Sequence, residues 1–358
     1  MLHLLSAEAG NDIMARICIY GAGAIGCYVG GRLLAAGADV AFIGRKPVGA
    51  ELHRHGLTLT DYRGGHWRQG PAVIAFATGP AAAATAELVL VTVKSAGTAT
   101  AGAELASVLQ PGTVVLSLQN GIGNAGLLRT ALPQQKVLAG MVAFNVVHRG
   151  QGAFHQGSQG HLHAQAAPAL TPFLASFTAA RLPLVRHDDM EPVLWAKLLL
   201  NLNNAINALS GLPLREELGQ RAYRRCLAIA QEEALGLLAR AGTRPARLTP
   251  LPAQLLPAVL RLPDGVFQRL GRRMLAIDPL ARSSMADDLV AGRPTEIDWL
   301  NGEVVRLAER LGRRAPVNTR LTALVRAAER DANRQYWPGE ALLAELQGAA
   351  GNPADATA

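Results

Sequence analysis

Three polar side chains form a narrow stripe on a mostly apolar stretch at residues 191–211. On a helix at 100° per residue, Lys197, Asn201 and Asn204 fall within about 60° of one another. A solvent-facing helix side is usually wider and more charged, so this narrow stripe indicates a helix that lines a cleft. A desolvated ammonium can give up its proton, so we expect Lys197 to act as a general acid toward a developing alkoxide. The alternative is a lysine at a helix edge whose ammonium reaches solvent.

A glycine-rich segment supplies a second chemical feature. The sequence GAGAIG has the GxGxxG spacing, follows a β-rich run at 16–20 and opens a helical pattern. Gly21 suits a tight turn, Gly23 lets the backbone approach a pyrophosphate, and Gly26 allows close helix–strand packing. We therefore expect a dinucleotide diphosphate at the helix N-terminus, the alternative being a glycine turn without ligand. The residues concerned are Gly21, Ala22, Gly23, Ala24, Ile25 and Gly26.

The end of the next predicted strand, 38–45, indicates which dinucleotide binds. An NAD-preferring site usually carries Asp or Glu there, to bind the ribose 2′-hydroxyl. This chain has Gly44, Arg45 and Lys46 instead. A guanidinium binds a 2′-phosphate with two hydrogen bonds and stacks on adenine, so Arg45 favours NADP(H). The alternative is an ordinary surface arginine, since only four of the 35 basic residues are lysine.

Two further groups would complete a site. Glu296 opens a predicted helix and would orient or tune Lys197. Ser283 and Ser284 begin the sequence SSMADD, an N-cap pattern whose free N–H groups suit a substrate carboxylate. Read in isolation, each of these groups is also consistent with a simple helix cap.

Composition excludes several classes of protein. With 358 residues, 49% of them apolar and 17% charged, the chain has material for two domains and is not disordered over most of its length. Aromatic residues make up 4%, which leaves few platforms for stacking nucleic-acid bases. No apolar run approaches the roughly 20 residues of a membrane span. The net charge of +8 comes from arginines interspersed with acids, so we expect neither nucleic-acid nor membrane partners.

The cysteines indicate a reducing compartment. Cys18, Cys27 and Cys226 are odd in number and form no CxxC pair, so we expect buried thiols, no disulfide and no metal site. We predict a cytoplasmic protein. Residues 1–13 lack the features of a signal peptide and are expected to be a dispensable extension.

The secondary-structure pattern differs between the two halves of the chain. In the first half, near-continuous apolar runs alternate with helical patterns, which is typical of parallel strands buried on both faces. A strand pair at 137–147 and 152–157 is expected to close this sheet. The second half shows helical patterns at 191–211, 224–242, 283–292 and 295–312, and a final amphipathic helix is expected at 319–334.

We therefore predict an α/β protein with an N-terminal Rossmann-type doubly wound sheet and an all-α C-terminal domain. The expected divisions are a dispensable extension at 1–13, an NADP-binding Rossmann-type domain at 14–187, a helical substrate and catalytic domain at 188–340, and a C-terminal helix end with a loose tail at 341–358.

Taken together, these motifs resemble the ketopantoate reductase (2-dehydropantoate 2-reductase) family over residues 16–333. The resemblance implies reduction of a 2-oxo acid, most of all ketopantoate to (R)-pantoate, by NADPH on the route to pantothenate and coenzyme A. The segments that carry it are GAGAIG (21–26), GR (44–45), VTVKS (91–95), LQNGIG (118–123), WAKLLLN (195–201), SSMADD (283–288), GRPTEIDWLNG (292–302) and PVNTRL (316–321).

The resemblance also implies residue roles. Lys197 matches the general acid, and Glu296 matches the acid beside the cofactor ribose and nicotinamide. Asn201 matches an amide that binds substrate, and Ser284 the hydroxyl that holds the substrate carboxylate. Further cofactor contacts are implied at Lys94 and Asn120, which lie at the ends of two strands, and near the backbone of Val146. Asn120 is close enough to touch the substrate as well.

Three positions depart from the family pattern. Ala205 and Ala281 stand where the family has amides, and Arg215 lies nearest to a third missing amide. Asn204 or Asn207 would be the substitutes. Two alternatives therefore stay open: a reductase of a different 2-oxo acid, and a non-enzymatic NADP(H)-binding regulator. We expect a monomer or a homodimer.

Overall fold

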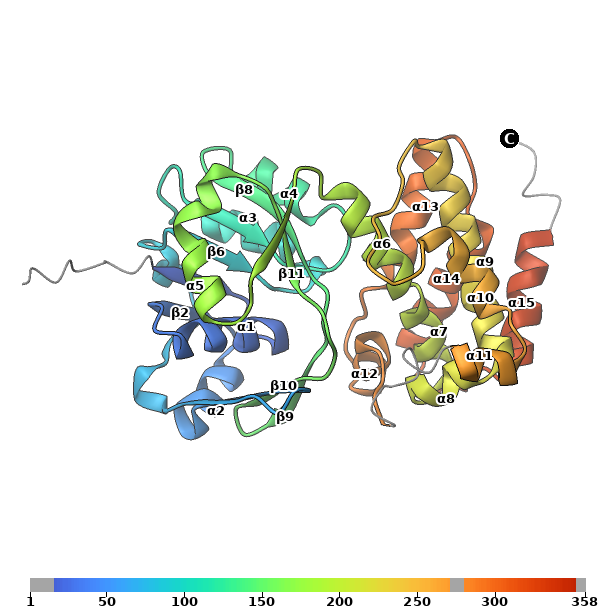
Figure 1. The fold of residues 1–358 in the computed structure, drawn as a ribbon, viewed down its shortest axis with the longest axis horizontal. Coiled ribbons are helices and arrows are strands. Elements are labelled where there is room, and N and C mark those ends of the chain that lie inside the picture. Colours follow the sequence, from blue (N-terminus) through green and yellow to red (C-terminus); the bar gives the residue numbers. More distant parts are fainter. Residues whose placement is uncertain (1–15, 271–279, 352–358) are drawn as a thin grey trace, which may run out of the picture.

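Two differently built halves lie side by side in the computed structural model, which describes residues 16–270 and 280–351 (Figure 1). The first half contains sheets with covering helices, and the second contains helices alone. The predicted fold class, a Rossmann-type sheet domain followed by an all-α domain, is confirmed. The expected extension at 1–13 and the end of the expected tail, 352–358, lie outside the described residues.

Short apolar runs form the central strands of the first half. The strands β1 (Ile17–Tyr20), β2 (Val40–Ile43), β6 (Leu88–Val91) and β7 (Val114–Ser117) are buried at every position. Side chains alternate across a strand, so those of β1 contribute in turn to the cores on either face of the sheet. Only a sheet covered on both faces can bury such runs.

The main sheet has eight strands in the order β12-β11-β8-β7-β6-β1-β2-β5. The chain runs from β1 outward through β2, and then returns to β6 on the other side of β1, with all of these strands parallel. The strand order thus reverses between β1 and β6, where open α/β sheets bind their ligands. The remaining strands are β5 (Ala75–Ala77), β8 (Lys136–Val142), β11 (Leu162–Gln165) and β12 (Leu184–His187).

A second, four-stranded sheet corrects the expectation for residues 137–157. Strand β8 does join the main sheet, but β9 (Val146–Gly150) and β10 (Ala153–Gln156) form a separate sheet with β3 (Leu57–Asp61) and β4 (His66–Gln69), in the order β4-β3-β10-β9. The reason lies in helix α1 (Ala24–Ala35), which is buried over most of its surface and contacts both sheets. The small sheet covers the side of α1 that the main sheet leaves open.

The other helices of the first half are short. They are α2 (Lys46–His55), α3 (Thr98–Ala106), α4 (Asn124–Ala131) and α5 (Leu174–Ala179). Short 3-10 turns occur at Pro71–Val73, Pro80–Ala83, Ser95–Gly97 and Pro168–Phe173.

The second half packs its helices around one apolar core. Its helices are α6 (Glu191–Asn201), α7 (Asn203–Ser210), α8 (Leu214–Gly219), α9 (Arg221–Arg240), α10 (Leu256–Leu260), α11 (Asp264–Leu270), α12 (Ser284–Val290), α13 (Asn301–Arg310), α14 (Pro316–Arg330) and α15 (Gly339–Gly351). Short 3-10 turns occur at Ala253–Leu255 and Ile297–Trp299. None of the helices in the described part of the chain is long and apolar enough to cross a membrane.

Three expectations for the helices need correction. The stretch 191–211 is interrupted by a turn at Leu202, although the dihedral angles there stay helical (φ −57°, ψ −24°). The stretch 295–312 divides at Leu300, whose ψ of −88° is not helical. The helix expected to be the last is followed by α15, which buries three leucines against the core, so residues 341–351 belong to a packed helix.

Candidate active site

The glycine segment after β1 has the geometry of a phosphate-binding turn. Gly21 has a φ of +115°, and a Cβ there would lie 2.6 Å from Val93 N. A Cβ on Gly26 would lie 2.3 Å from Gly21 O, whereas a Cβ on Gly23 would meet nothing within 4 Å. Gly23 caps α1, which has neither an acidic residue nor a side-chain cap in its first turn. The main-chain N–H groups of residues 21–23 donate to Ile43 O and Gly21 O, so the donors left for an anion are those of residues 24–26 at the start of α1, where the diphosphate of a dinucleotide would bind.

Arg45 lies beside this turn. Gly44 packs on Ala22, so closely that a Cβ on Gly44 would lie 2.7 Å from Ala22 Cβ. Arg45 follows as the N-cap residue of α2 and is exposed. Its guanidinium makes no hydrogen bond or ion pair with any residue that the structure describes.

Glu296 reaches from the helical half to the segments that follow the neighbouring strands β6 and β7. The main-chain N–H and the hydroxyl of Ser95 each donate to Glu296 Oε1 over 3.0 Å. The Asn120 amide donates to Glu296 Oε2 over 3.2 Å. Ser95 follows β6 and Asn120 follows β7, so both Glu296 carboxylate oxygens are held near the carboxyl ends of these two central strands. Ser95 had no predicted role, although its place in VTVKS, four residues after the end of a buried strand, was an available signal.

Lys94 makes a second link between the halves. Its ammonium forms an ion pair with Asp288 of α12, a buried carboxylate that also pairs with Arg293 at 3.1 Å. Lys94 and Asn120 were both expected at the cofactor, and the structure places both at the strand ends. The role of Asp288 was missed, because the pairing joins segments that are far apart in the chain.

Lys197 is positioned by the docking of α6 against the sheet. Val193 and Leu194 of α6 share a small apolar cluster with Ala139 and Met141 of β8. Lys197 follows on this helix, half-buried and without a hydrogen bond or ion pair to any described residue. Desolvation by the surrounding protein lowers the pKa of Lys197 to about 8. An ammonium in this state is poised to donate its proton.

The expected pairing of Glu296 with Lys197 is not observed. No hydrogen bond or ion pair joins the two among the residues that the structure describes. Both Glu296 oxygens are already engaged with Ser95 and Asn120. Glu296 therefore holds the two halves of the molecule together at the strand ends, and Lys197 owes its lowered pKa to desolvation.

Ser284 lies at the start of α12, close to α7. Ser283 caps the helix, since its Oγ accepts from the Ala286 N–H over 3.1 Å. The Ser283 N–H donates to Asn207 Oδ1 over 2.9 Å, which ties the start of α12 to α7. Ser284 is exposed as the first residue of the helix. Asn201 is half-buried at the end of α6, on the same side of the segment as Lys197.

Val146 lies four residues after the end of the main-sheet strand β8. It begins β9 in the small sheet and packs against the core that surrounds α1. Lys94 and Asn120 likewise follow strands of the main sheet.

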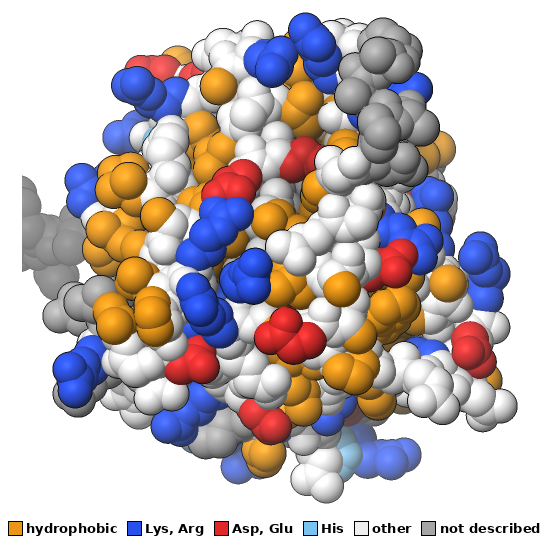
Figure 2. All heavy atoms as spheres, turned by 90° about the vertical axis from the view of Figure 1, so that its right-hand side faces the viewer, with side chains coloured by type: hydrophobic (Ala, Val, Ile, Leu, Met, Phe, Trp, Pro, Cys, Tyr) orange, Lys and Arg blue, Asp and Glu red, His pale blue; other side chains and the backbone are white. Residues whose placement is uncertain are grey.

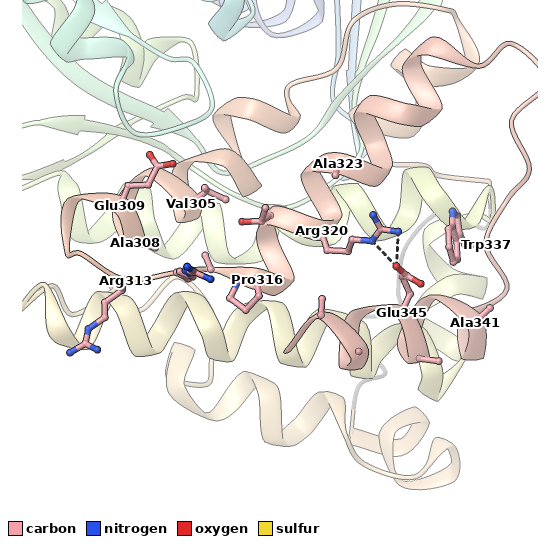
Figure 3. Close-up of a pocket in the computed structure, with 16 residues that line it drawn as sticks. Val305, Ala308, Glu309, Arg313, Pro316, Arg320, Ala323, Trp337, Ala341 and Glu345 are labelled. Atoms are coloured by element: carbon pink, nitrogen blue, oxygen red, sulfur yellow. Dashed lines mark hydrogen bonds and ion pairs between the residues drawn. The ribbon is translucent and has the colours of Figure 1, made fainter. Parts of the chain in front are cut away.

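A groove in the helical half involves none of these groups. It has a volume of about 1070 Å³, lies between α13, α14 and α15, and is lined by several alanines and by an ion pair of Arg320 with Glu345 (Figure 3). The face that carries α15 mixes basic, acidic and apolar side chains (Figure 2). None of the predicted site residues lines this groove. In the described residues we also find no cluster of His, Cys, Asp and Glu able to hold a metal ion.

Comparisons with known proteins identify the family of the chain. Residues 17–169 match the family described as ketopantoate reductase PanE/ApbA, and residues 189–329 match the C-terminal part of the same family. A protein of Halobacterium salinarum named 2-dehydropantoate 2-reductase is 28% identical, over 88% of this chain and 99% of its own.

Solved structures show the same likeness. A PanE/ApbA family ketopantoate reductase from Ralstonia eutropha JMP134 has a TM-score of 0.75 and 31% identity, covering 88% of this chain and 98% of its own. A D-mandelate dehydrogenase, solved with NADH and anilino(oxo)acetate, has a TM-score of 0.72 over the same shares of the two chains. Its identity is 20%, so this second likeness concerns the fold alone.

Proposed function

The chain belongs to the ketopantoate reductase family, and from this premise we propose that it reduces 2-dehydropantoate (ketopantoate) to (R)-pantoate with NADPH, using Lys197 as general acid. Membership makes it an oxidoreductase of the 2-dehydropantoate 2-reductase type with a nicotinamide cofactor. The preference for NADPH, the role of Lys197, the substrate and its place in pantothenate and coenzyme A synthesis are the proposal. The observation that carries it is the unpaired, desolvated ammonium of Lys197 on a helix docked against the nucleotide-binding sheet.

The first half of the chain would bind the cofactor. Main-chain N–H groups of the turn at 21–26 hold the diphosphate, and Arg45 binds the 2′-phosphate. Glu296 and Asn120, which already face each other at the strand ends, bind the ribose beside the nicotinamide. Lys94 and the backbone near Val146 make further contacts with the cofactor. When bound, NADPH supplies a hydride to the keto carbon.

The helical half would bind and protonate the substrate. Ser284 and the free N–H groups at the start of α12 hold the carboxylate of the 2-oxo acid. The Asn201 amide contacts the substrate next to Lys197. Lys197 polarises the keto oxygen by a hydrogen bond and then transfers its proton to that oxygen, which leaves a neutral amine and a hydroxy acid.

A different 2-oxo acid is the second candidate substrate. Ala205 is fully buried in the helical core, and Arg215 is exposed on α8, so neither offers the amide that the family pattern places there. A neighbour in fold is named D-mandelate dehydrogenase, which supports testing other 2-oxo acids.

The test is a turnover assay that follows loss of NADPH absorbance, with ketopantoate, benzoylformate and alkyl 2-oxo acids as substrates and NADH as the alternative cofactor. Fast NADPH-dependent turnover of ketopantoate is the expected result. Turnover of another acid only would reassign the substrate. Tight NADPH binding without any turnover would identify a regulator and refute the proposal.

A further inference from the structure

Buried polar side chains form a chain of hydrogen bonds that ends at Glu296. The Gln119 amide donates to Thr98 Oγ1 over 2.7 Å, and Thr98 Oγ1 donates to Asn124 Oδ1 over 2.7 Å. The Asn124 amide donates to Ser95 Oγ over 3.1 Å, and Ser95 Oγ lies 3.0 Å from Glu296 Oε1. The four residues before Glu296 are all buried, so water does not compete for these hydrogen bonds.

The orientation of the Asn124 amide is set by its neighbours. Its nitrogen is within hydrogen-bond distance of the main-chain oxygen of Asn120, and a carbonyl oxygen can only accept. The Asn124 oxygen therefore faces Thr98, which donates to it. One N–H group of the Asn124 amide thus goes to Asn120 O, and the other goes to Ser95 Oγ.

The single proton of the Ser95 hydroxyl has two acceptors within reach. Asn120 O lies 2.9 Å from Ser95 Oγ, and Glu296 Oε1 lies 3.0 Å from it. Asn124 already supplies Asn120 O with a donor, and a carboxylate is the stronger acceptor of the two. The Ser95 proton is therefore directed to Glu296 for as long as the Asn124 amide is in place.

Three donors fill most of the acceptor positions of Glu296. A carboxylate has about four such positions. Oε1 accepts from the main-chain N–H and the hydroxyl of Ser95, and Oε2 accepts from the Asn120 amide. No other donor contacts this carboxylate in the part of the chain that the structure describes. One position on Oε2 is thus left, and a hydroxyl of the cofactor ribose is a donor that fits it.

We propose that Asn124 is a positioning residue for the nicotinamide end of the cofactor. Through Ser95 and Asn120 it fixes the donors on Glu296, so that the carboxylate keeps one acceptor position for a ribose hydroxyl. Without the Asn124 amide, the Ser95 proton turns to Asn120 O, and Glu296 loses a donor that orients it. This inference rests on the cofactor part of the proposed function.

The experiment compares NADPH with adenosine 2′,5′-bisphosphate, which shares the adenosine end but lacks the nicotinamide ribose, by their Kd in isothermal titration calorimetry. In Asn124→Leu, which keeps the side-chain volume and removes both N–H groups, we expect the Kd of NADPH to rise about tenfold and that of the bisphosphate to stay within about twofold. Asn333→Leu, at an exposed asparagine after α14, is the matched control and should change neither value.

A second variant tests the route through Ser95. Ser95→Ala removes the hydroxyl and keeps the main-chain N–H that donates to Glu296. It should weaken NADPH binding selectively, as Asn124→Leu does. Because the two residues act in one hydrogen-bond chain, the double variant should raise the Kd of NADPH by less than the product of the two single effects.

The outcomes separate this inference from the proposed function. An equal rise in Kd for both ligands in both single variants would mark a general structural role and overturn the inference. An unchanged Kd of NADPH would overturn it as well. If the wild-type protein binds NADPH but reduces no 2-oxo acid, the proposed function fails, while the Kd values still decide the inference. If it does not bind NADPH, both fail.

Discussion

The two sides of the candidate active site use different chemical groups, main-chain N–H groups on the nucleotide side and side chains on the helical side. On the nucleotide side, the turn at 21–26 offers main-chain N–H groups, and its glycines are set by contacts with adjoining strands. On the helical side, Lys197, Asn201 and Ser284 offer side chains, whose directions depend on how α6, α7 and α12 pack together. A backbone site needs only a short local sequence, whereas a side-chain site needs a correctly assembled domain.

The largest effect should come from removing the single acid on the helical side. We expect Lys197→Ala to lower kcat about 10²–10⁴-fold, the usual contribution of a positioned general acid. NADPH affinity, measured by fluorescence titration, should be unchanged, because the nucleotide side is built separately. Lys136→Ala, at an exposed lysine of β8, is the control. A kcat within about threefold of wild type would remove Lys197 from the mechanism.

On the nucleotide side, the effect should appear as a change in cofactor preference. Arg45→Ala is expected to lower the ratio of kcat/KM with NADPH to that with NADH by about 10–100-fold, the scale of a lost charged hydrogen bond. Turnover at saturating cofactor should change little. Arg54→Ala, an exposed arginine of the same helix, provides the comparison. Equal losses of kcat/KM with both cofactors would show that Arg45 does not bind the 2′-phosphate.

The lowered pKa of Lys197 gives the helical side a pH signature. A general acid works only while protonated, so kcat/KM for reduction should be level below pH 8 and fall about tenfold per pH unit above it. A lysine with an ordinary pKa of about 10.4 would keep activity well into the alkaline range. A pH–rate profile that stays flat to pH 10 or so would contradict the desolvated state of Lys197.

The smallest expected effect is on stability and concerns Glu217, which accepts a hydrogen bond from the buried Asn203. Burial raises the pKa of Glu217 to about 8, against an ordinary value of 4.5. Between these values the folded protein holds a proton that the unfolded chain releases, so this group's stabilisation is complete below pH 4.5 and is lost as pH rises to about 8.

Glu217→Gln stays neutral at every pH and still accepts from Asn203. Melting curves should therefore show wild type losing stability relative to this variant as pH rises across that window. Glu216→Gln, at an exposed neighbour, should follow wild type throughout. If Glu217→Gln and wild type ran parallel at all pH values, Glu217 would not be the buried acid described above.

The features that could be predicted from the sequence are those formed by consecutive segments of the chain. The glycine turn was predictable because its strand, turn and helix are consecutive, and the close contact of Gly26 with Gly21 O is a local one. The polar stripe through Lys197 was also predictable, since helical periodicity survives the break at Leu202. The small sheet was not, because β10 pairs with β3 from far away in the chain.

The sequence by itself determined which residues have the chemistry to act: a glycine turn for phosphate, Arg45 beside it and one lysine among amides. Only the tertiary structure decided which of these groups are free. It engaged Glu296 with Ser95, 201 positions away, and buried Asn203 and Asn207 while leaving Asn204 unpaired. The physical reason is that propensity and periodicity act between near neighbours in the chain, whereas desolvation and hydrogen-bond satisfaction depend on every segment that folds against a side chain.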